Sequence, residues 1–145
     1  MTDFPSHPFG DVITAETIQQ AMAEAKGWED KYRYVIQIGK QLQPINSESK
    51  LDTHLVSGCE SKVWLFHRWQ DGKIQLWADS DARIVKGLLA IVLAAYNGKT
   101  AEEINKFDKD GYFNSLGLLN HLTPTRSNGV YAVIDKIIEN TNFTS

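Results

Sequence analysis

Apolar side chains recur every three or four residues in the first part of the chain, which predicts two helices before residue 43. Residues 1–12 contain two prolines and a glycine and are expected to form an extended arm. Thr14 is the predicted N-cap of the first helix, which Gly27 should end. A second helix should start near Trp28, with Glu29 and Arg33 as an i,i+4 ion pair on its polar side. Its predicted apolar stripe consists of Trp28, Tyr32, Val35, Ile36 and then Leu42.

The period then changes, and residues 63–78 alternate as a β-hairpin does. Asp71-Gly72 separates the two apolar runs, and this dipeptide favours a two-residue turn of the primed type. The return strand should place Ile74, Leu76 and Ala78 on one buried face. A long polar stretch, residues 43–56, precedes the hairpin and is expected to be a loop.

Helical spacing returns after the hairpin. Residues 82–96 are apolar almost all round, which predicts a buried central helix with capping oxygens from Asp79, Ser80 and Asp81. Two short helices should follow, the first starting at a capping box of Thr100 and Glu103. Pro124 should open the last helix, whose apolar face consists of Val130, Val133, Ile134, Ile137 and Ile138.

The order of these elements is helices, one hairpin and helices again, which predicts an α+β fold rather than an alternating α/β fold. A chain of 145 residues is expected to form a single domain over 1–145 with a substantial core. The net charge of −3 and the scattered lysines and arginines argue against a nucleic-acid partner. The longest apolar run, 87–96, is too short to cross a membrane, and the N-terminus does not resemble a signal peptide. We therefore expect a cytoplasmic protein.

The chain has one cysteine, Cys59, which follows Gly58 where the polar stretch meets the first strand. A lone cysteine excludes an internal disulfide and a cysteine-rich metal or cluster site, so its chemistry would be that of a single thiol. Lys62 would lower the pKa of this thiol and Glu60 would raise it. Composition alone does not distinguish a functional cysteine from a semi-buried one with no role. The position of Cys59 in a polar loop beside Gly58 favours a function. A Cys–His hydrolase is the alternative enzyme hypothesis, with His54 and His121 as candidate bases.

Other charged residues give weaker indications of a site. Asp79 and Asp81 are better explained as helix caps than as catalytic acids. Arg126 near the start of the last helix opposes the helix dipole, which suggests a nearby anion or carboxylate, although a solvated side chain is the simpler explanation. The sequence contains no glycine-rich phosphate loop and no cluster of metal ligands. We expect no metal and no bound cofactor.

Several short runs together carry a family resemblance. These are Trp28–Tyr32, Gly58-Cys59 with Val63-Trp64, Asp79–Asp81 with Ile84–Leu89, and Leu122–Gly129. From about His7 to the last helix, the chain resembles the SufE family of sulfur-acceptor proteins. The N-terminal run His7–Gly10 with Thr14–Thr17 resembles the family branch that pairs with a desulfurase of the CsdA type more than it resembles SufE itself.

The resemblance implies a compact SufE/NifU-like α+β domain, also seen in iron–sulfur scaffold proteins. It implies that Cys59 accepts persulfide sulfur from a pyridoxal-phosphate cysteine desulfurase of the CsdA or SufS type, stimulates it, and relays the sulfur to a downstream acceptor or scaffold. Scaffolds carry several cluster ligands, so one cysteine sets that role aside. The pyridoxal phosphate would belong to the partner. We expect the protein to work in iron–sulfur cluster assembly or related sulfur trafficking, with no turnover of its own.

Exposed charges near a reactive thiol can steer a partner and set its register. The predicted docking surface therefore lies around the cysteine loop and the start of the central helix. His121 and Arg126 are predicted to lie near the pocket of the thiol. The docking candidates are Glu60, Lys62, Asp79, Asp81 and Arg83. A binding module with an inert cysteine remains a third hypothesis.

Overall fold

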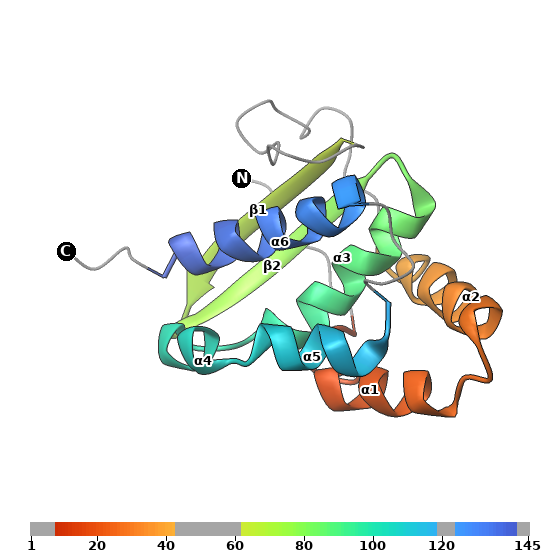
Figure 1. The fold of residues 1–145 in the computed structure, drawn as a ribbon. Helices are drawn as coiled ribbons and strands as arrows, with labels where there is room; N and C mark the ends of the chain where they lie inside the picture. The colour runs from red at the N-terminus through yellow and green to blue at the C-terminus, as the bar shows by residue number, and fades with distance from the viewer. Residues whose placement is uncertain (1–7, 43–61, 119–123, 142–145) are drawn as a thin grey trace.

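The computed structural model describes residues 8–42, 62–118 and 124–141, and these ranges contain six helices and one two-stranded antiparallel sheet (Figure 1). This arrangement confirms the predicted α+β class. The elements in chain order are α1 (Ala15–Glu24), α2 (Trp28–Gly39), β1 (Val63–Gln70), β2 (Lys73–Ser80), α3 (Arg83–Tyr96), α4 (Ala101–Lys106), α5 (Lys109–Leu116) and α6 (Pro124–Glu139).

Helix α3 is the centre of the fold. Every residue of α3 from Gly87 to Tyr96 is buried, as its nearly unbroken apolar sequence predicts. Helices α1, α2 and α6 and strand β2 all contact it. In Figure 1, α3 runs between α2 on one side and the hairpin on the other. Burial on all sides makes α3 the element against which the others are positioned.

Two glycines let α2 and α3 approach until their backbones touch. A Cβ atom added to Gly87 would lie 2.2 Å from the backbone oxygen of Val35, and one added to Gly39 would lie 2.8 Å from the backbone nitrogen of Gly87. Real Cβ atoms do not come this close to backbone atoms, so both positions require glycine. The crossing sets which side of α2 is buried, and that side carries Val35, Ile38 and Gly39.

The hairpin has the turn that its sequence predicts. Asp71 and Gly72 have φ angles of 56° and 79°, as both central residues of a type I′ turn must. The strands pair from Val63 opposite Ser80 to Gln70 opposite Lys73. Ile74, Leu76 and Ala78 are buried against the main core, which confirms the predicted inner face.

The turn after α3 covers the outer edge of β2. The backbone nitrogen of Ile74 donates to the carbonyl of Lys99 at 2.9 Å, and the nitrogen of Gly98 donates to the carbonyl of Ile74 at 2.8 Å. The side-chain oxygen of Asn97 accepts from the nitrogen of Leu76 at 2.7 Å. These bonds satisfy backbone groups of an edge strand that would otherwise be open to pairing with another chain.

The prediction of an extended arm over residues 1–12 is wrong for its described part, residues 8–12. Phe9 is fully buried in the core, and a turn at Gly10 brings the chain back to Ile13. The side-chain nitrogen of Asn97 donates to the carbonyl of Phe9 at 3.0 Å. This segment is therefore anchored at one end of α3.

The helix termini largely follow their sequence signals. Thr14 caps α1, the box of Thr100 and Glu103 begins α4, and Gly117 ends α5 in the left-handed conformation. Helix α1 ends at Glu24, three residues before the predicted stop at Gly27, which is instead the N-cap of α2.

Two predictions about α2 are wrong. Arg33 pairs with Asp30 at 3.2 Å, in place of the predicted Glu29. The predicted stripe is also not uniformly buried, because Tyr32 is 43% exposed and Trp28 and Ile36 are only partly covered.

We expect Gly87→Ala to lower the free energy of unfolding by at least about 2 kcal/mol, because the added methyl group collides with the backbone of α2 and overpacking is costly. Urea unfolding followed by circular dichroism would measure the change. Gly27→Ala is the control for losing a glycine without a collision, because a Cβ at Gly27 meets no atom within 4 Å and its φ of 164° is extended. It should cost less than about 1 kcal/mol, since alanine is only a poorer N-cap for α2 than glycine. Equal stability of the Gly87 variant and the control would contradict the conclusion that the close approach of α2 and α3 requires glycine at this position.

Candidate functional site

Several of the predicted site residues lie outside the described part of the chain. Cys59 and Glu60 lie outside the described residues, and so do His54 and His121. Arg126 belongs to the first turn of α6, but its side chain is also outside the described part. In the sequence, Cys59 precedes Val63, the first residue of β1, by four positions.

Ser80 joins the start of β1 to the start of α3. Its hydroxyl donates to the carbonyl oxygen of Lys62 at 2.8 Å and accepts from the backbone nitrogen of Ala82 at 3.2 Å. The backbone nitrogen of Asp81 also donates to the Lys62 carbonyl, at 3.4 Å. We call Lys62, Ser80, Asp81 and Ala82 the Ser80 junction. It fixes the point at which the cysteine-bearing segment enters the hairpin.

Asp79 lies beside this junction, but it is buried, with a relative exposure of 2%. One carboxylate oxygen accepts from the backbone nitrogen of Ser80 at 2.8 Å and lies 3.4 Å from the ammonium nitrogen of Lys86 on α3. The prediction that Asp79 is an exposed docking charge is therefore wrong. A carboxylate in this environment needs a cationic partner, and Lys86 supplies the positive charge.

The capping prediction for α3 is correct only in part. The N-cap of α3 is Ala82, which forms no side-chain cap bond. Of the three residues expected to cap, Ser80 does offer its hydroxyl to the nitrogen of Ala82. Asp79 serves the strand end and Lys86 instead, and the side chain of Asp81 is exposed.

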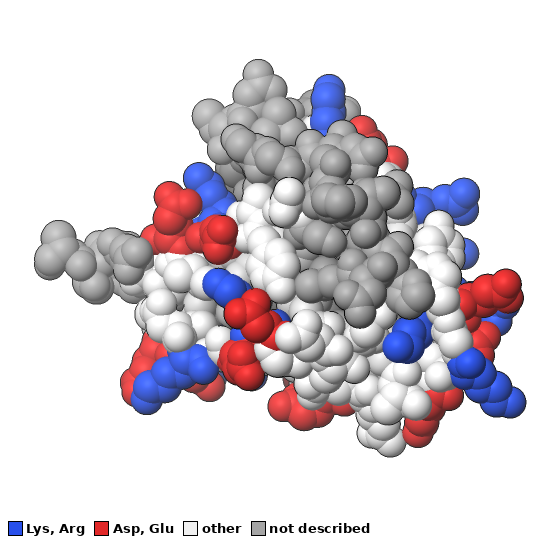
Figure 2. Space-filling view, viewed as in Figure 1, with Lys and Arg blue, Asp and Glu red and all other residues white. Residues whose placement is uncertain are grey.

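Three of the predicted docking residues are exposed at the surface. Lys62, Asp81 and Arg83 are exposed, and the Ser80 junction holds Lys62 beside Asp81. They present two positive charges and one negative charge beside the entry to the cysteine-bearing segment. On the face shown in Figure 2, the described acidic and basic side chains are interspersed, without a region of one sign. The described part of that face would therefore be recognised by its local pattern of charges rather than by a single large charged region.

The outer face of the hairpin carries a second cluster of buried aromatic side chains. Trp64, Phe66 and Trp77 are each less than 10% exposed and are separate from the main core. The rings of Phe66 and Trp77 lie 5.5 Å apart on paired positions of the two strands. Trp64 is the cross-strand partner of Asp79. The aromatic cluster therefore borders the buried carboxylate.

The sequence interpretation missed Lys86 as the partner of Asp79, the joining role of Ser80, and the aromatic cluster. Of these three features, only the aromatic cluster could have been predicted from the sequence. Trp64, Phe66 and Trp77 alternate with the inward positions of both strands, so both faces of the hairpin are apolar and both need cover.

Within the described ranges, no helix is long and apolar enough to cross a membrane. The same ranges contain no group of three or more histidine, aspartate, glutamate or cysteine residues placed to hold a metal ion.

The protein is a small α+β domain with one cysteine, which precedes the hairpin in the sequence. Comparison with known proteins gives its family. The model of the SufE family, described as an Fe-S metabolism associated domain, matches residues 16–141. The chain is 43% identical over 136 residues to the sulfur acceptor protein CsdE of Escherichia coli K12, covering 93% of this chain and 92% of that protein. The protein therefore belongs to the SufE family, as its sequence motifs predicted.

A solved structure supports the fold. The chain matches the solution structure of a hypothetical protein from Thermus thermophilus with a TM-score of 0.68, over 86% of this chain and 92% of that one. The identity of the pair is 19%, so this likeness concerns the fold alone.

We expect Lys86→Met to lower the free energy of unfolding by about 3 kcal/mol, because it removes the ammonium group that lies 3.4 Å from the buried carboxylate of Asp79. The double variant Asp79→Asn/Lys86→Met should recover much of that loss, since it also removes the buried charge. Chemical unfolding of both single variants and the double variant would give the coupling energy.

The control for this pair is Lys106→Met. Lys106 pairs with Glu102 at 2.7 Å, but both side chains are 75% exposed, so its loss should change stability little. An equal effect at Lys86 and Lys106 would show that burial of the Asp79 pair has no energetic consequence.

Proposed function

We propose that this protein is a sulfur acceptor that takes persulfide sulfur onto Cys59 from a cysteine desulfurase, stimulates that enzyme, and relays the sulfur onward in iron–sulfur cluster assembly or related trafficking. The observation that carries the proposal is the position of the one cysteine, three residues before the Ser80 junction, in a chain of the SufE family. The name of the relative CsdE supports an acceptor role.

The proposed chemistry needs one thiol and no cofactor on this chain. The Cys59 thiolate attacks the terminal sulfur of a persulfide on the desulfurase. A sulfur–sulfur bond to Cys59 forms as the bond to the desulfurase cysteine breaks, and the electron pair leaves on the desulfurase thiolate. The reaction exchanges one disulfide-type bond for another, so it requires no oxidant or reductant. The pyridoxal phosphate that generates the first persulfide belongs to the partner.

We propose that the desulfurase docks on Lys62, Asp81 and Arg83, with Glu60 in the adjoining segment. The support for this surface is that the Ser80 junction holds Lys62 and Asp81 together, with exposed Arg83 two residues further along the chain. A partner that binds these charges would be brought to the segment that carries the thiol. Because the junction is bonded to both the hairpin and α3, docking there meets a rigid platform. A rigid platform loses little conformational entropy when a partner binds.

We propose that His121 and Arg126 lie near the thiol of Cys59. A positive charge there would stabilise the thiolate. A reducing cytoplasm suits the free thiol that the reaction needs. The downstream acceptor and the type of desulfurase, CsdA-like or SufS-like, are parts of the same proposal.

Incubation with a cysteine desulfurase and free cysteine should increase the intact mass of this protein by one or more sulfur atoms. Cys59→Ser should gain none, because a serine hydroxyl does not form a persulfide. Intact-protein mass spectrometry under non-reducing conditions measures the change. Equal labelling of the serine variant would show that Cys59 is not the acceptor.

The wild-type protein and the Cys59→Ser variant also distinguish the alternative functions. Hydrolysis of a small ester or amide by the wild type without a desulfurase would favour the Cys–His hydrolase. Desulfurase stimulation that survives Cys59→Ser would favour a binding module with an inert cysteine.

Asp81→Arg should alter desulfurase stimulation several-fold while leaving the thermal midpoint nearly unchanged, because the side chain of Asp81 is exposed and takes no part in capping α3. Steady-state desulfurase kinetics and thermal unfolding provide the two measurements. Glu24→Arg on α1 is a control with the same charge change at another exposed position. Unchanged stimulation by the Asp81 variant would remove this residue from the docking surface.

A further inference from the structure

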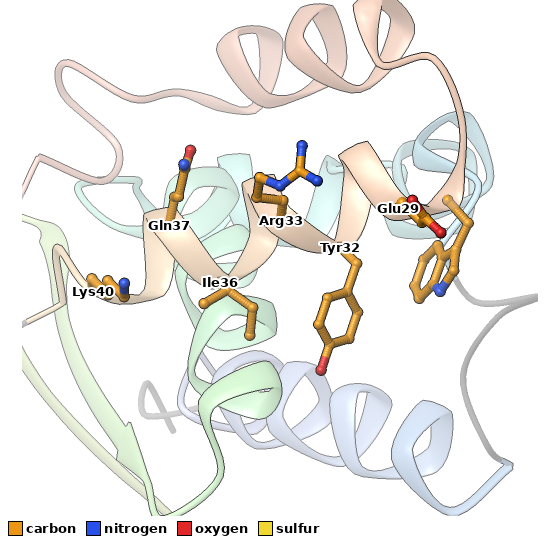
Figure 3. Close-up of a pocket in the computed structure, with 7 residues that line it drawn as sticks. Glu29, Tyr32, Arg33, Ile36, Gln37 and Lys40 are labelled. Atoms are coloured by element: carbon orange, nitrogen blue, oxygen red, sulfur yellow. The ribbon is translucent and has the colours of Figure 1, made fainter.

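One side of α2 lines a surface groove of about 570 Å³. Trp28, Tyr32 and Ile36 follow one another at intervals of four residues along it, and the rings of Trp28 and Tyr32 meet edge to face with centroids 5.8 Å apart. Tyr32 is one of only two large apolar residues that are exposed in the described part of the chain. Figure 3 shows Tyr32 and Ile36 projecting from the same side of α2. An aromatic strip of this kind on a surface helix is typical of a binding site for another helix.

The charged residues of the groove are separated along α2. Glu29 lies at one end of the row and Lys40 at the other, with Tyr32 and Ile36 between them (Figure 3). Arg33 also lines the groove and is paired with Asp30. Neither Glu29 nor Lys40 forms an ion pair with another described residue. The groove therefore has an acidic end and a basic end, about 17 Å apart at 1.5 Å per residue.

An occupant that fits this groove must carry the opposite order of charges. A second copy of α2, turned antiparallel by a two-fold axis, has that order. Residues i and j face each other across such an axis when their numbers have a constant sum. Placing Glu29 opposite the partner's Lys40 gives a sum of 69, and the axis then passes between residues 34 and 35. The same operation places Lys40 opposite the partner's Glu29, so both ion pairs form together.

The axis brings the apolar positions of the two helices within one residue of each other. A sum of 69 places Tyr32 opposite the partner's Gln37 and Ile36 opposite the partner's Arg33. Tyr32 therefore lies one position away from the partner's Ile36. Trp28 lies next to the partner's Lys40, where an ammonium group over an indole is favourable. The dipoles of the two helices also run antiparallel. The charged ends and the helix direction are thus complementary under one two-fold operation.

We propose that this chain self-associates through the α2 groove as a two-fold antiparallel helix pair. The interface uses one 12-residue helix from each copy, so it lies near or below the roughly 1,200 Å² at which stable interfaces begin. The dimer is accordingly weak and forms in a concentration-dependent way, with a dissociation constant of about 10 to 100 µM. This association does not depend on sulfur transfer at Cys59.

Sedimentation velocity in reducing buffer tests the proposal with the full chain. Wild type should shift from monomer to dimer between about 5 µM and 500 µM, a range that brackets the expected dissociation constant. Glu29→Lys and Lys40→Glu should each raise that constant at least about tenfold, because each places two pairs of like charges across the axis. Glu24→Lys and Lys136→Glu make the same changes at exposed positions outside the groove and should leave it unaltered.

Charge exchange between copies gives the decisive measurement. A mixture of Glu29→Lys and Lys40→Glu should form a heterodimer, because every facing pair is then of opposite sign. The double variant Glu29→Lys/Lys40→Glu should pair with itself as the wild type does. A wild-type chain that stays monomeric over the whole range overturns the proposal and leaves the groove to a different protein. A dimer that is indifferent to the single reversals, or single variants that fail to pair when mixed, also overturns it.

Discussion

The contact between Gly39 and Gly87 is the constraint on which the rest of the fold depends. Helices usually pack with their axes 8–10 Å apart because side chains separate them. Here a side chain at either glycine would enter the backbone of the other helix. The close approach buries Val35 and Ile38 against α3 and orients α2 about its own axis. That rotation turns Trp28, Tyr32 and Ile36 toward the flank of the molecule, so a feature of the surface follows from a contact in the interior.

Local chemistry explains why much of the fold could be predicted from the sequence. The type I′ turn at Asp71-Gly72, the capping box at Thr100 and the stop at Gly117 each depend on residues within a few positions of one another. The buried helix α3 was also predictable, because a run that is apolar on all sides fits only the interior. The burial of α2 was misjudged because a glycine adds nothing to an apolar pattern, although Gly39 marks the most closely packed side of that helix.

The site was less predictable because its contacts are long-range. Cys59 stood out by type and by its position beside Gly58, and the family motifs gave it a role. Nothing in the sequence near Asp79 distinguishes a buried carboxylate from an exposed cap. The difference depends on Lys86, which reaches back from α3. The joining role of Ser80 likewise requires Lys62, which is 18 positions away.

The side chain of Asn97 has a consequence for how the protein opens. Its amide bonds the backbone of Phe9 and that of Leu76, so it holds the N-terminal segment and the second strand to the end of α3. These three segments are far apart in the sequence, and a fluctuation that frees one of them also removes a hydrogen bond from the others. Amide hydrogens in all three should therefore exchange with solvent as one cooperative unit rather than by separate fraying. A two-stranded ribbon is marginal by itself, and this coupling lets it share the stability of the helical core.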